Sequence, residues 1–412
     1  MSVRICVVTA GHLSTTPRML KAADALHGAG YRVRVVSVNH TPWATDTDSV
    51  VMATRAWSWS VVDCSRTTAR AAQVITGARF RAAQALATAL GPERVPFPLA
   101  VRAYSRAHDE IVRAVTAEPA DFVYGGTTGA LAAVAESARR LGVPYGIDLE
   151  DFHSAEQLGP DSALASALAE RVERRVLPGA SCLTTSSPMI AEAYLDKYGV
   201  RPIPVHNTFS ISFADAGGAP DPTVLRLYWF SQTLGPGRGL EDVVRAIGQA
   251  GGATALHLRA RPIPAYFDAL QALQRDVAPA LALVRHDPAP PDEMVRLARG
   301  YDAGLSCEEP VVLNHRLCLG NKIFTYLAAG IPVILSRTPA QAALAQDLGS
   351  AAFSYECGDV GGLAQVLRRL RDEPGARAQS QSAARAAAER RWHWEHPDDR
   401  GALLAAVARA VA

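Results

Sequence analysis

Short apolar runs alternate with helical patterns along almost the whole chain. In the first half, the run RICVVTA at 4–10 precedes a helical pattern over 17–27, and the run YRVRVVSV at 31–38 follows it. The same order recurs for DFVYG at 121–125, a helical pattern, and PYGIDL at 144–149. Strands that alternate with helices in this way predict a parallel sheet with helices on both faces.

The alternation restarts at VLRLYWFSQ, residues 224–232, and continues through the second half. A segment rich in Gly, Pro and Asp, at 208–223, precedes this restart and indicates a domain boundary. We therefore predict an α/β protein with two Rossmann-like, doubly wound domains at 1–207 and 223–383, followed by a helical segment at 384–412. Because ligands bind at the carboxyl ends of strands in such sheets, the domains are expected to face a central cleft.

The composition excludes several classes of protein. The 412 residues are 49% hydrophobic and 20% charged, which is typical of a globular chain. A formal net charge of +2 gives no field that favours nucleic acid. No apolar run approaches the ~20 residues that span a bilayer, and the start lacks a signal-peptide pattern. The six cysteines form no CxxC pair, so we expect reduced packing residues in a cytoplasmic protein, and no metal site.

Residues 66–106 interrupt the alternation with a helical stretch that is rich in Ala and Arg. Its arginines at 66, 70, 79 and 81 can meet anionic lipid at a membrane surface. A solvated helix face is the simpler interpretation, so peripheral membrane contact is kept as the alternative.

A short apolar helix is predicted within CLGNKIFTYLAAGIPVILS, residues 318–336, before a buried strand. The helix begins with the polar residues Asn321 and Lys322. Free backbone N–H groups at a helix N-terminus favour anions, and Lys322 adds a positive charge. We predict that this end faces a phosphate group, with an ordinary solvated N-cap as the alternative. The candidate binding residues of this helix are Asn321, Lys322, Ile323 and Thr325.

A glycine-rich loop lies within FSQTLGPGRGLEDVVRAI, residues 230–247, between a strand end and a helix. Glycines such as Gly237 allow the backbone to approach a ligand closely. Arg238 can bind phosphate oxygens with its forked guanidinium. A glycine-rich loop alone is weak evidence, but together with the helix at 321 it predicts a phosphate site.

Carboxylates follow two further predicted strands. Glu308 and Glu309 end the run DAGLSCEE and can accept hydrogen bonds from sugar hydroxyls, although an exposed acidic turn is the alternative. In GIDLEDFHSAE, residues 146–156, Glu150 and His153 follow a buried strand. Several ionisable groups after a strand end predict a site for a polyhydroxy ligand or for proton transfer, and a solvated loop is again the alternative.

The loop after the first strand is a further candidate. It contains Gly11, and Thr16 and Pro17 after it fit the N-cap and the first position of a helix. We include Gly11 among the candidate ligand-binding residues.

Three stretches resemble the GT-B glycosyltransferases, in particular the large family 4 of retaining enzymes. They are TPRMLKAADALHGAGYRV at 16–33, LGPGRGLEDV at 234–243 and EEPVVLNHRLCLGNKIFTYLAAGIPV at 308–333. The resemblance covers nearly the whole chain and is strongest over 227–336. It implies a first domain that binds the acceptor, a second that binds a nucleoside diphosphate sugar, and a last helix that crosses back to the first domain.

Roles in the second domain also follow from the resemblance. It implies that Arg238 contacts the diphosphate and that Glu308 lies near the donor sugar. Thr233 stands where many members have a further arginine, and Thr325 stands where a second glutamate usually holds the ribose. In the first domain, the position of the family's active-site histidine is occupied by Glu150, with His153 three residues later.

The resemblance implies an enzyme that moves a sugar from a nucleoside diphosphate sugar to an acceptor hydroxyl. It further implies retention of configuration, in bacterial glycan or glycosylated-metabolite biosynthesis. No cofactor or metal is expected, because cationic side chains and a helix dipole can stabilise the diphosphate. One alternative is a non-catalytic binding partner of another glycosyltransferase. The absence of the family's second glutamate, at Thr325, supports this alternative. The other is a nucleotide-sugar epimerase on the same fold. The nucleotide, the sugar, the acceptor and the oligomeric state stay open.

Overall fold

The chain divides into two compact units. The first comprises residues 1–206 and 397–412, and the second comprises residues 207–396. The computed structural model describes four stretches, residues 2–156, 159, 162–213 and 223–412. Much of the boundary segment predicted at 208–223 therefore lies outside the described residues.

The first unit is built on a seven-stranded parallel sheet with the order β3-β2-β1-β4-β5-β6-β7. Its strands are β1 (Arg4–Thr9), β2 (Arg32–Asn39), β3 (Ser58–Asp63), β4 (Phe122–Gly126), β5 (Tyr145–Leu149), β6 (Cys182–Thr185) and β7 (Ile203–Pro204). Its helices are α1 (Pro17–Gly28), α2 (Pro42–Met52), α3 (Arg70–Leu90), α4 (Phe97–Tyr104), α5 (His108–Thr116), α6 (Leu131–Leu141), α7 (Ser162–Val176), α8 (Pro188–Tyr198) and α17 (Ala402–Val411). The strand order reverses between β1 and β4.

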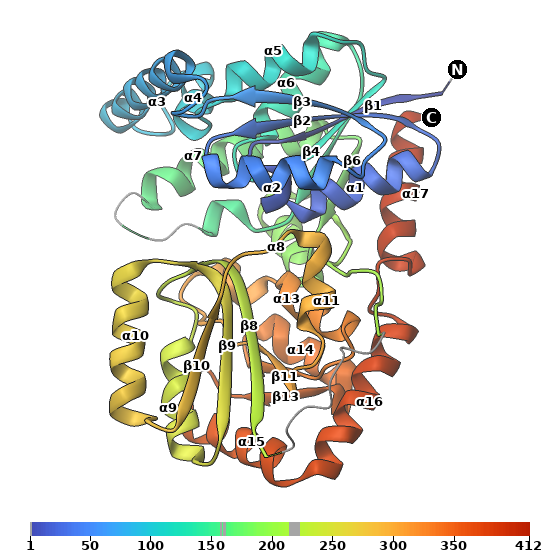
Figure 1. Cartoon of the computed structure of the whole chain (residues 1–412). Coiled ribbons are helices and arrows are strands. Elements are labelled where there is room, and N and C mark those ends of the chain that lie inside the picture. Colours follow the sequence, from blue (N-terminus) through green and yellow to red (C-terminus); the bar gives the residue numbers. More distant parts are fainter. Residues whose placement is uncertain (1, 157–158, 160–161, 214–222) are drawn as a thin grey trace. The chain divides into compact units, whose positions relative to one another are not determined.

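The second unit repeats this plan with six parallel strands in the order β10-β9-β8-β11-β12-β13. Its strands are β8 (Leu225–Leu234), β9 (Thr254–Pro262), β10 (Leu281–His286), β11 (Ala303–Ser306), β12 (Val333–Ser336) and β13 (Ala352–Tyr355). Its helices are α9 (Leu240–Ala250), α10 (Pro264–Val277), α11 (Met294–Ala298), α12 (Leu313–Leu317), α13 (Asn321–Ala328), α14 (Pro339–Leu348), α15 (Val360–Asp372) and α16 (Pro374–Arg390). Figure 1 shows β8, β9 and β10 side by side. The order here reverses between β8 and β11, so the prediction of two Rossmann-like, doubly wound sheets is confirmed.

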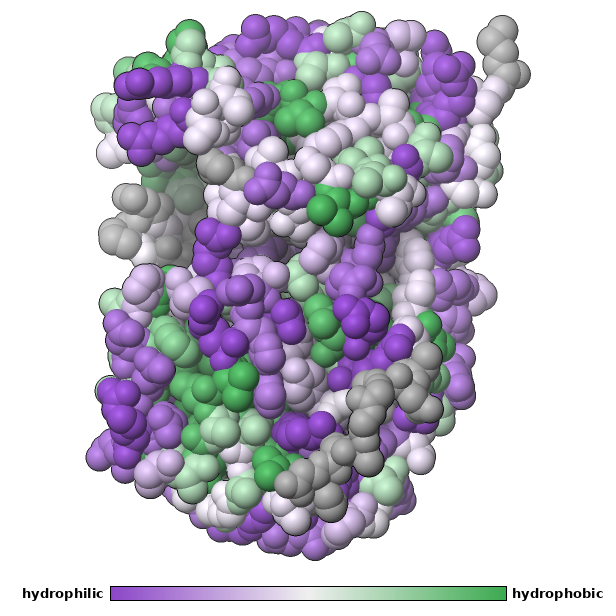
Figure 2. Space-filling view, viewed as in Figure 1, coloured by the Kyte–Doolittle hydropathy of each residue, from purple (hydrophilic) through white to green (hydrophobic). Residues whose placement is uncertain are grey.

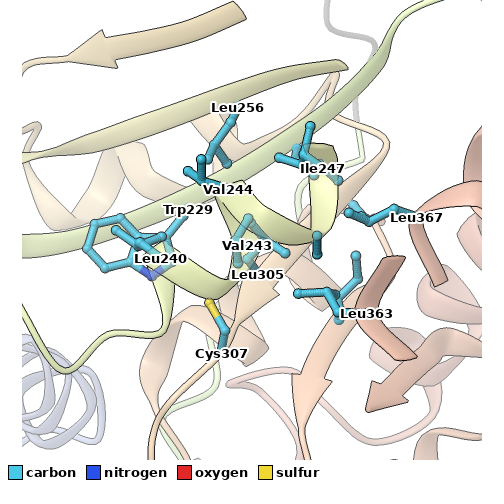
Figure 3. Close-up of a cluster of buried hydrophobic side chains, with 14 of the residues drawn as sticks. Trp229, Leu240, Val243, Val244, Ile247, Leu256, Leu305, Cys307, Leu363 and Leu367 are labelled. Carbon is cyan, nitrogen blue, oxygen red and sulfur yellow. The ribbon is translucent and has the colours of Figure 1, made fainter. Parts of the chain in front are cut away.

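The strands of both units are apolar runs because helices cover both faces of a parallel sheet, so that side chains on either face are buried. In β1, the side chains of Ile5, Val7 and Val8 are at most 1% exposed. In the second unit, α9 presents Leu240, Val243, Val244 and Ile247 to the sheet, at the i, i+3, i+4, i+7 spacing of one helix face. Figure 3 shows these side chains packed among residues of the strands and of α15.

The last residues of the chain belong to the first unit, beginning at Pro397. The buried carboxylate of Asp399 accepts a hydrogen bond of 2.8 Å from the backbone N–H of His206. The helix α16, in which the predicted C-terminal segment begins, belongs to the second unit.

Figure 2 shows hydrophilic residues over much of the visible face, with hydrophobic residues gathered where β9 and β10 lie in Figure 1. Among the described residues, no helix combines the length and the apolar character needed to cross a membrane. None of the six cysteines forms a disulfide bond, and Cys6, Cys64, Cys182 and Cys307 are buried.

Candidate active site

The strand-order reversal of the second unit brings the glycine-rich loop and the predicted acidic turn together. The loop at 235–239 follows β8, the residues Glu308 and Glu309 follow β11, and these two strands are neighbours in the sheet. Gly239 has a φ of +69°, and a Cβ atom there would collide with the carbonyl oxygen of Cys307. The loop therefore packs directly on the end of β11, and only glycine allows this close approach.

Glu308 lies between two cationic side chains. The amine of Lys322 contacts Oε1 of Glu308, and Nη1 of Arg238 lies 3.7 Å from Oε2. The side chains of Glu308 and Lys322 are 8% and 7% exposed, whereas that of Arg238 is 38% exposed. Arg238 is therefore the member of this cluster that is open to a ligand.

Packing beneath the cluster holds it in position. The hydroxyl of Ser336, at the end of β12, donates a hydrogen bond of 2.7 Å to the backbone carbonyl of Glu308. The amine of Lys322 lies 5.9 Å from the ring centroid of Trp229, within the range of a cation–π contact. Two strands of the sheet, β12 and β8, thus supply groups that help to hold Glu308 and Lys322.

The electrostatics of the cluster keep Glu308 ionised. Burial alone would raise the pKa of this carboxyl group, but Lys322 and, more weakly, Arg238 and His315 outweigh burial and hold the pKa below its usual value. At neutral pH the carboxylate and the amine of Lys322 offset each other, and Arg238 contributes a net positive charge.

The first turns of α13 offer fewer polar groups to a ligand than the sequence predicts. The side chains of Ile323 and Thr325 are fully buried, and the Thr325 hydroxyl donates a hydrogen bond of 3.0 Å to the carbonyl of Asn321. The N–H of Ile323 donates to the carbonyl of Gly320 at 3.2 Å. Asn321 is partly exposed at the start of the helix. The ring of His315, on α12, donates a hydrogen bond of 2.9 Å to the carbonyl of the partly exposed Glu309.

The first unit has a corresponding reversal between β1 and β4, and Gly11 lies in the loop after β1. The N–H of Gly11 donates to the hydroxyl of Thr9 at 3.2 Å. In the loop after β4, Thr127 has a φ of +79°, a conformation that no other non-glycine residue of the described part adopts. Its hydroxyl accepts a hydrogen bond of 3.1 Å from the N–H of Ala10. Strain of this kind gathers at functional sites, so it adds to the case for a site at this edge.

A buried ion pair fixes the end of β5. Arg18 donates two hydrogen bonds to Asp148, of 2.7 and 2.6 Å, and a third of 2.6 Å to the carbonyl of Val205. Thr184 donates to the same carboxylate at 2.6 Å. Asp148 therefore has a structural role, because its carboxylate holds the end of β5 in place. Glu150 follows two residues later and is partly exposed.

His153 lies in a short 3-10 turn at His153–Ala155 with its side chain 1% exposed. Its Nδ1 atom is 3.0 Å from Oε2 of Glu156 and 3.3 Å from the hydroxyl of Thr128. Among the described residues its Nε2 atom has no hydrogen-bond partner, although it is buried. A buried polar atom without a partner costs stability, so Nε2 of His153 is a candidate for a hydrogen bond to a ligand or to water.

The protonation of His153 decides what it can do. Burial would lower its pKa, but the carboxylates of Glu156, Glu173 and Asp151 outweigh burial and raise the pKa to about 9. The ring is therefore an imidazolium at neutral pH, and its Nε2–H is a hydrogen-bond donor rather than a base.

Lys21 is an ionisable residue that sequence reasoning missed. It lies on α1, three residues after Arg18, and burial, together with Arg18, lowers its pKa to about 7 against the opposing effect of Asp399, Glu150 and Asp148. The composition could have drawn attention to Lys21, because the chain has only three lysines and otherwise uses arginine.

Two family models match the chain in succession. The Glycosyl transferase 4-like domain matches residues 15–207, and the Glycosyl transferase-like family matches residues 265–397. The chain is a GT-B glycosyltransferase. The enzyme class and the fold implied by the resemblance are thereby confirmed.

Solved structures similar to this glycosyltransferase cover nearly its whole length. HepE of Anabaena, in complex with UDP and glucose, has a TM-score of 0.69 and 15% identity over 99% of each chain. A variant of TarM of S. aureus, in complex with UDP, has a TM-score of 0.68 and 8% identity over 99% of each chain. A putative UDP-N-acetylglucosamine 2-epimerase of Listeria monocytogenes has a TM-score of 0.60 and 13% identity, covering 99% of this chain and 96% of its own. At these identities the likeness shows the fold alone, and a search of curated proteins gives no match.

The predicted site residues of the glycosyltransferase fall into two groups. In the second unit, Arg238 contacts Glu308, which contacts Lys322, and Gly237, Glu309 and Asn321 lie in the same loops and first helical turn. In the first unit, Gly11 lies after β1, and Glu150 and His153 lie after β5. Sequence reasoning missed Ser336, Trp229 and His315 in the first of these groups, and Glu156 as the partner of His153. Among the described residues, no group of three or more His, Cys, Asp or Glu is arranged to hold a metal ion.

Proposed function

We propose that this glycosyltransferase moves a sugar from a UDP-sugar to an acceptor hydroxyl, and that the second unit binds the donor. The observation that carries the proposal is the cluster of Arg238, Glu308 and Lys322 at the strand-order reversal, where doubly wound sheets bind nucleotides. Structures of HepE with UDP and with UDP-glucose support a uridine nucleotide as the donor.

Within this proposal, Arg238 binds the diphosphate, because it is the exposed cation of the cluster. The amine of Lys322 lies on Glu308, so its role is to keep that carboxylate ionised and in place. Glu308 then faces the sugar, where a negative charge favours the positive charge that develops on the anomeric carbon. The exposed start of α13 adds the partial positive charge of a helix N-terminus to the phosphate side.

The bond changes are those of a simple group transfer. The bond between the anomeric carbon and the diphosphate oxygen breaks, and its electron pair leaves with the diphosphate. The acceptor oxygen bonds to the same carbon and loses its proton. We propose that the first unit holds the acceptor, that Glu150 or the departing phosphate takes this proton, and that the imidazolium of His153 donates a hydrogen bond to a substrate oxygen. Retention of configuration is proposed from the likeness to family 4.

Metal independence is part of the same proposal. Arg238 and the start of α13 provide the positive charge that a divalent ion supplies in other transferases. Six cysteines that form no disulfide bond support a reducing, cytoplasmic setting. Turnover that disappears in EDTA and returns with Mg²⁺ or Mn²⁺ would contradict this part.

The test is product analysis with UDP-glucose and UDP-N-acetylglucosamine, each with and without a panel of glycan and lipid-linked hydroxyl acceptors. The proposal predicts UDP release that depends on acceptor, with a glycosylated product. Conversion of the donor to an epimeric UDP-sugar without acceptor would favour an epimerase. UDP binding without turnover of either donor would favour a non-catalytic binding partner, which the replacement of the family glutamate by Thr325 would explain.

A further inference from the structure

The helix α3 carries an apolar face that is open to solvent. It packs on α4 through small side chains, including Ala83 and Ala87, within a cluster that also contains Ala103 of α4 and Leu168 of α7. Figure 1 shows α3 at the margin of the first unit, beside α4. Four of the nine large hydrophobic side chains exposed in the described part of the chain lie on this one helix: Val74, Ile75, Leu86 and Leu90, which are 54%, 62%, 45% and 48% exposed.

These side chains belong to one continuous stripe. Exposed alanines at 71, 78, 82, 85 and 89 connect them at the three- and four-residue spacing of one helix face. At about 1.5 Å per residue, the stripe runs roughly 28 Å along the helix. An apolar stripe of this length on a solvent-facing helix indicates a binding surface rather than scattered surface residues.

The charged residues of α3 itself are all positive. The 21 residues of α3 include no Asp or Glu. Arg70 and Arg81 on the helix are exposed, as are Arg66 before it and Arg94 after it, and none of the four has a carboxylate partner in the described part of the chain. Arg79 differs, because it pairs with Glu110 at 2.5 Å and with Asp109 at 3.2 Å. Glu93 is an exposed acid three residues after the helix end in the sequence.

We propose that α3 docks the protein onto an anionic lipid bilayer, lying flat in the interface. The apolar stripe would enter the boundary between headgroups and acyl chains, and the unpaired arginines would bind lipid phosphates. Charge complementarity favours an anionic bilayer, rather than a second copy of the chain, as the partner of α3. A symmetric α3–α3 contact would bury two stripes that carry arginines and no carboxylate to neutralise them. The inference does not depend on the identity of the donor nucleotide.

The experiment is sedimentation of the full-length protein with vesicles of phosphatidylcholine alone and of an equimolar mixture of phosphatidylcholine and phosphatidylglycerol. Binding is expected to the anionic vesicles and to fall with salt. Ile75→Glu with Leu86→Glu should lower the partition coefficient roughly tenfold or more. Arg70→Gln with Arg81→Gln should lower it by roughly fivefold for each arginine, which corresponds to about 1 kcal/mol.

Matched controls separate the helix from general surface effects. Val50→Glu with Val61→Glu changes two apolar residues that are 60% and 43% exposed elsewhere in the first unit, and should leave the partition coefficient unchanged. Unfolding midpoints should match the wild type in all variants, since every changed side chain is exposed. Equal binding by the wild type and the α3 variants would overturn the proposal. A dimer that dissociates on Ile75→Glu with Leu86→Glu, without vesicle binding, would also overturn it and assign α3 to a protein contact.

Discussion

The buried amine of Lys322 contacts the carboxylate of Glu308, so two opposite charges share one site at the first turn of α13. Removal of either partner leaves the other buried without its closest counter-charge, and Glu308 then keeps only Arg238, 3.7 Å away. The pair therefore has a structural role that is separate from any role in catalysis, and the two roles need different measurements.

We expect Lys322→Met to lower the free energy of unfolding by about 3–5 kcal/mol, because the buried Glu308 loses its closest counter-charge and keeps only the more exposed Arg238. The double variant Lys322→Met with Glu308→Gln should be less destabilised than the sum of the single variants, because it removes both charges. Urea unfolding of all three proteins measures this coupling. Strict additivity would mean that the two side chains do not interact in solution.

The pair of Lys322 and Glu308 also makes the free energy of unfolding depend on pH. Because the folded state holds the pKa of Glu308 below its usual value, the pair stabilises the protein above a pH of about 4.5, and this contribution is lost as the pH falls through the folded pKa. The difference in unfolding free energy between wild type and Glu308→Gln should therefore shrink in acid. A constant difference between neutral pH and acid would contradict the assignment.

For turnover, we expect Glu308→Gln to reduce kcat far more than it weakens UDP binding. The amide keeps the shape of the carboxylate but lacks the charge that favours a developing cation on the sugar. Glu309→Gln is the matched control, since Glu309 is partly exposed and its contact with His315 uses the backbone carbonyl. Near-normal kcat in Glu308→Gln with a large loss in Glu309→Gln would transfer the role to Glu309. Near-normal kcat in both variants would mean that neither carboxylate acts on the sugar, and would favour a non-catalytic binding protein.

His153 should titrate above neutrality. Its folded pKa of about 9 exceeds the ordinary value of 6.5, so its contribution to stability is complete below pH 6.5 and is lost as the pH rises through 9. We expect the stability advantage of wild type over His153→Gln to decline over this window. Glu156→Gln should move the titration of the His153 ring to lower pH in NMR spectra, because Glu156 is its nearest carboxylate. A ring that titrates near 6.5 in the wild type would contradict the imidazolium assignment.

Gly239 and Gly199 offer a matched pair of glycines in the left-handed conformation, with φ of +69° and +70° and ψ of 12° and 16°. A Cβ atom at Gly239 would meet the carbonyl of Cys307, whereas one at Gly199 would meet nothing within 4 Å. Gly199→Ala should therefore cost only the roughly 1–2 kcal/mol of a left-handed backbone conformation. Gly239→Ala should cost more and should also weaken UDP binding, because the loop must move away from β11. Equal losses of stability, with unchanged UDP affinity, would show that the loop does not depend on this contact.

The sequence predicted the sheets and the neighbourhood of Arg238 and Glu308 well, for a physical reason. Alternating apolar runs determine the strands, and a strand order that reverses at the first strand of each unit places the ends of β8 and β11 side by side. The loop at 235–239 and Glu308 must then meet, whatever their separation along the chain.

Side-chain burial and charge state could not be predicted in this way. The sequence predicted that Lys322 faces a phosphate group, with a solvated helix start as the alternative. The side chain is instead covered, because it contacts Glu308 after β11 and lies 5.9 Å from the ring centroid of Trp229 in β8. The pKa of His153 depends on Glu173 as well as on the nearby Glu156. The hydroxyl of Thr325 bonds within its own helix, a local alternative that a comparison of motifs does not reveal. These features depend on contacts between distant segments.

The most direct test of the account is isothermal titration calorimetry of UDP with the wild type, Arg238→Ala and the control Arg296→Ala. Arg296 is an exposed arginine of the same unit that pairs with Glu293. We expect Arg238→Ala to weaken UDP binding by about 1.5–3 kcal/mol, the range for a hydrogen bond to a charged group, and Arg296→Ala to leave it unchanged. Equal UDP affinity in the wild type and in Arg238→Ala would contradict the proposal that this cluster binds the diphosphate.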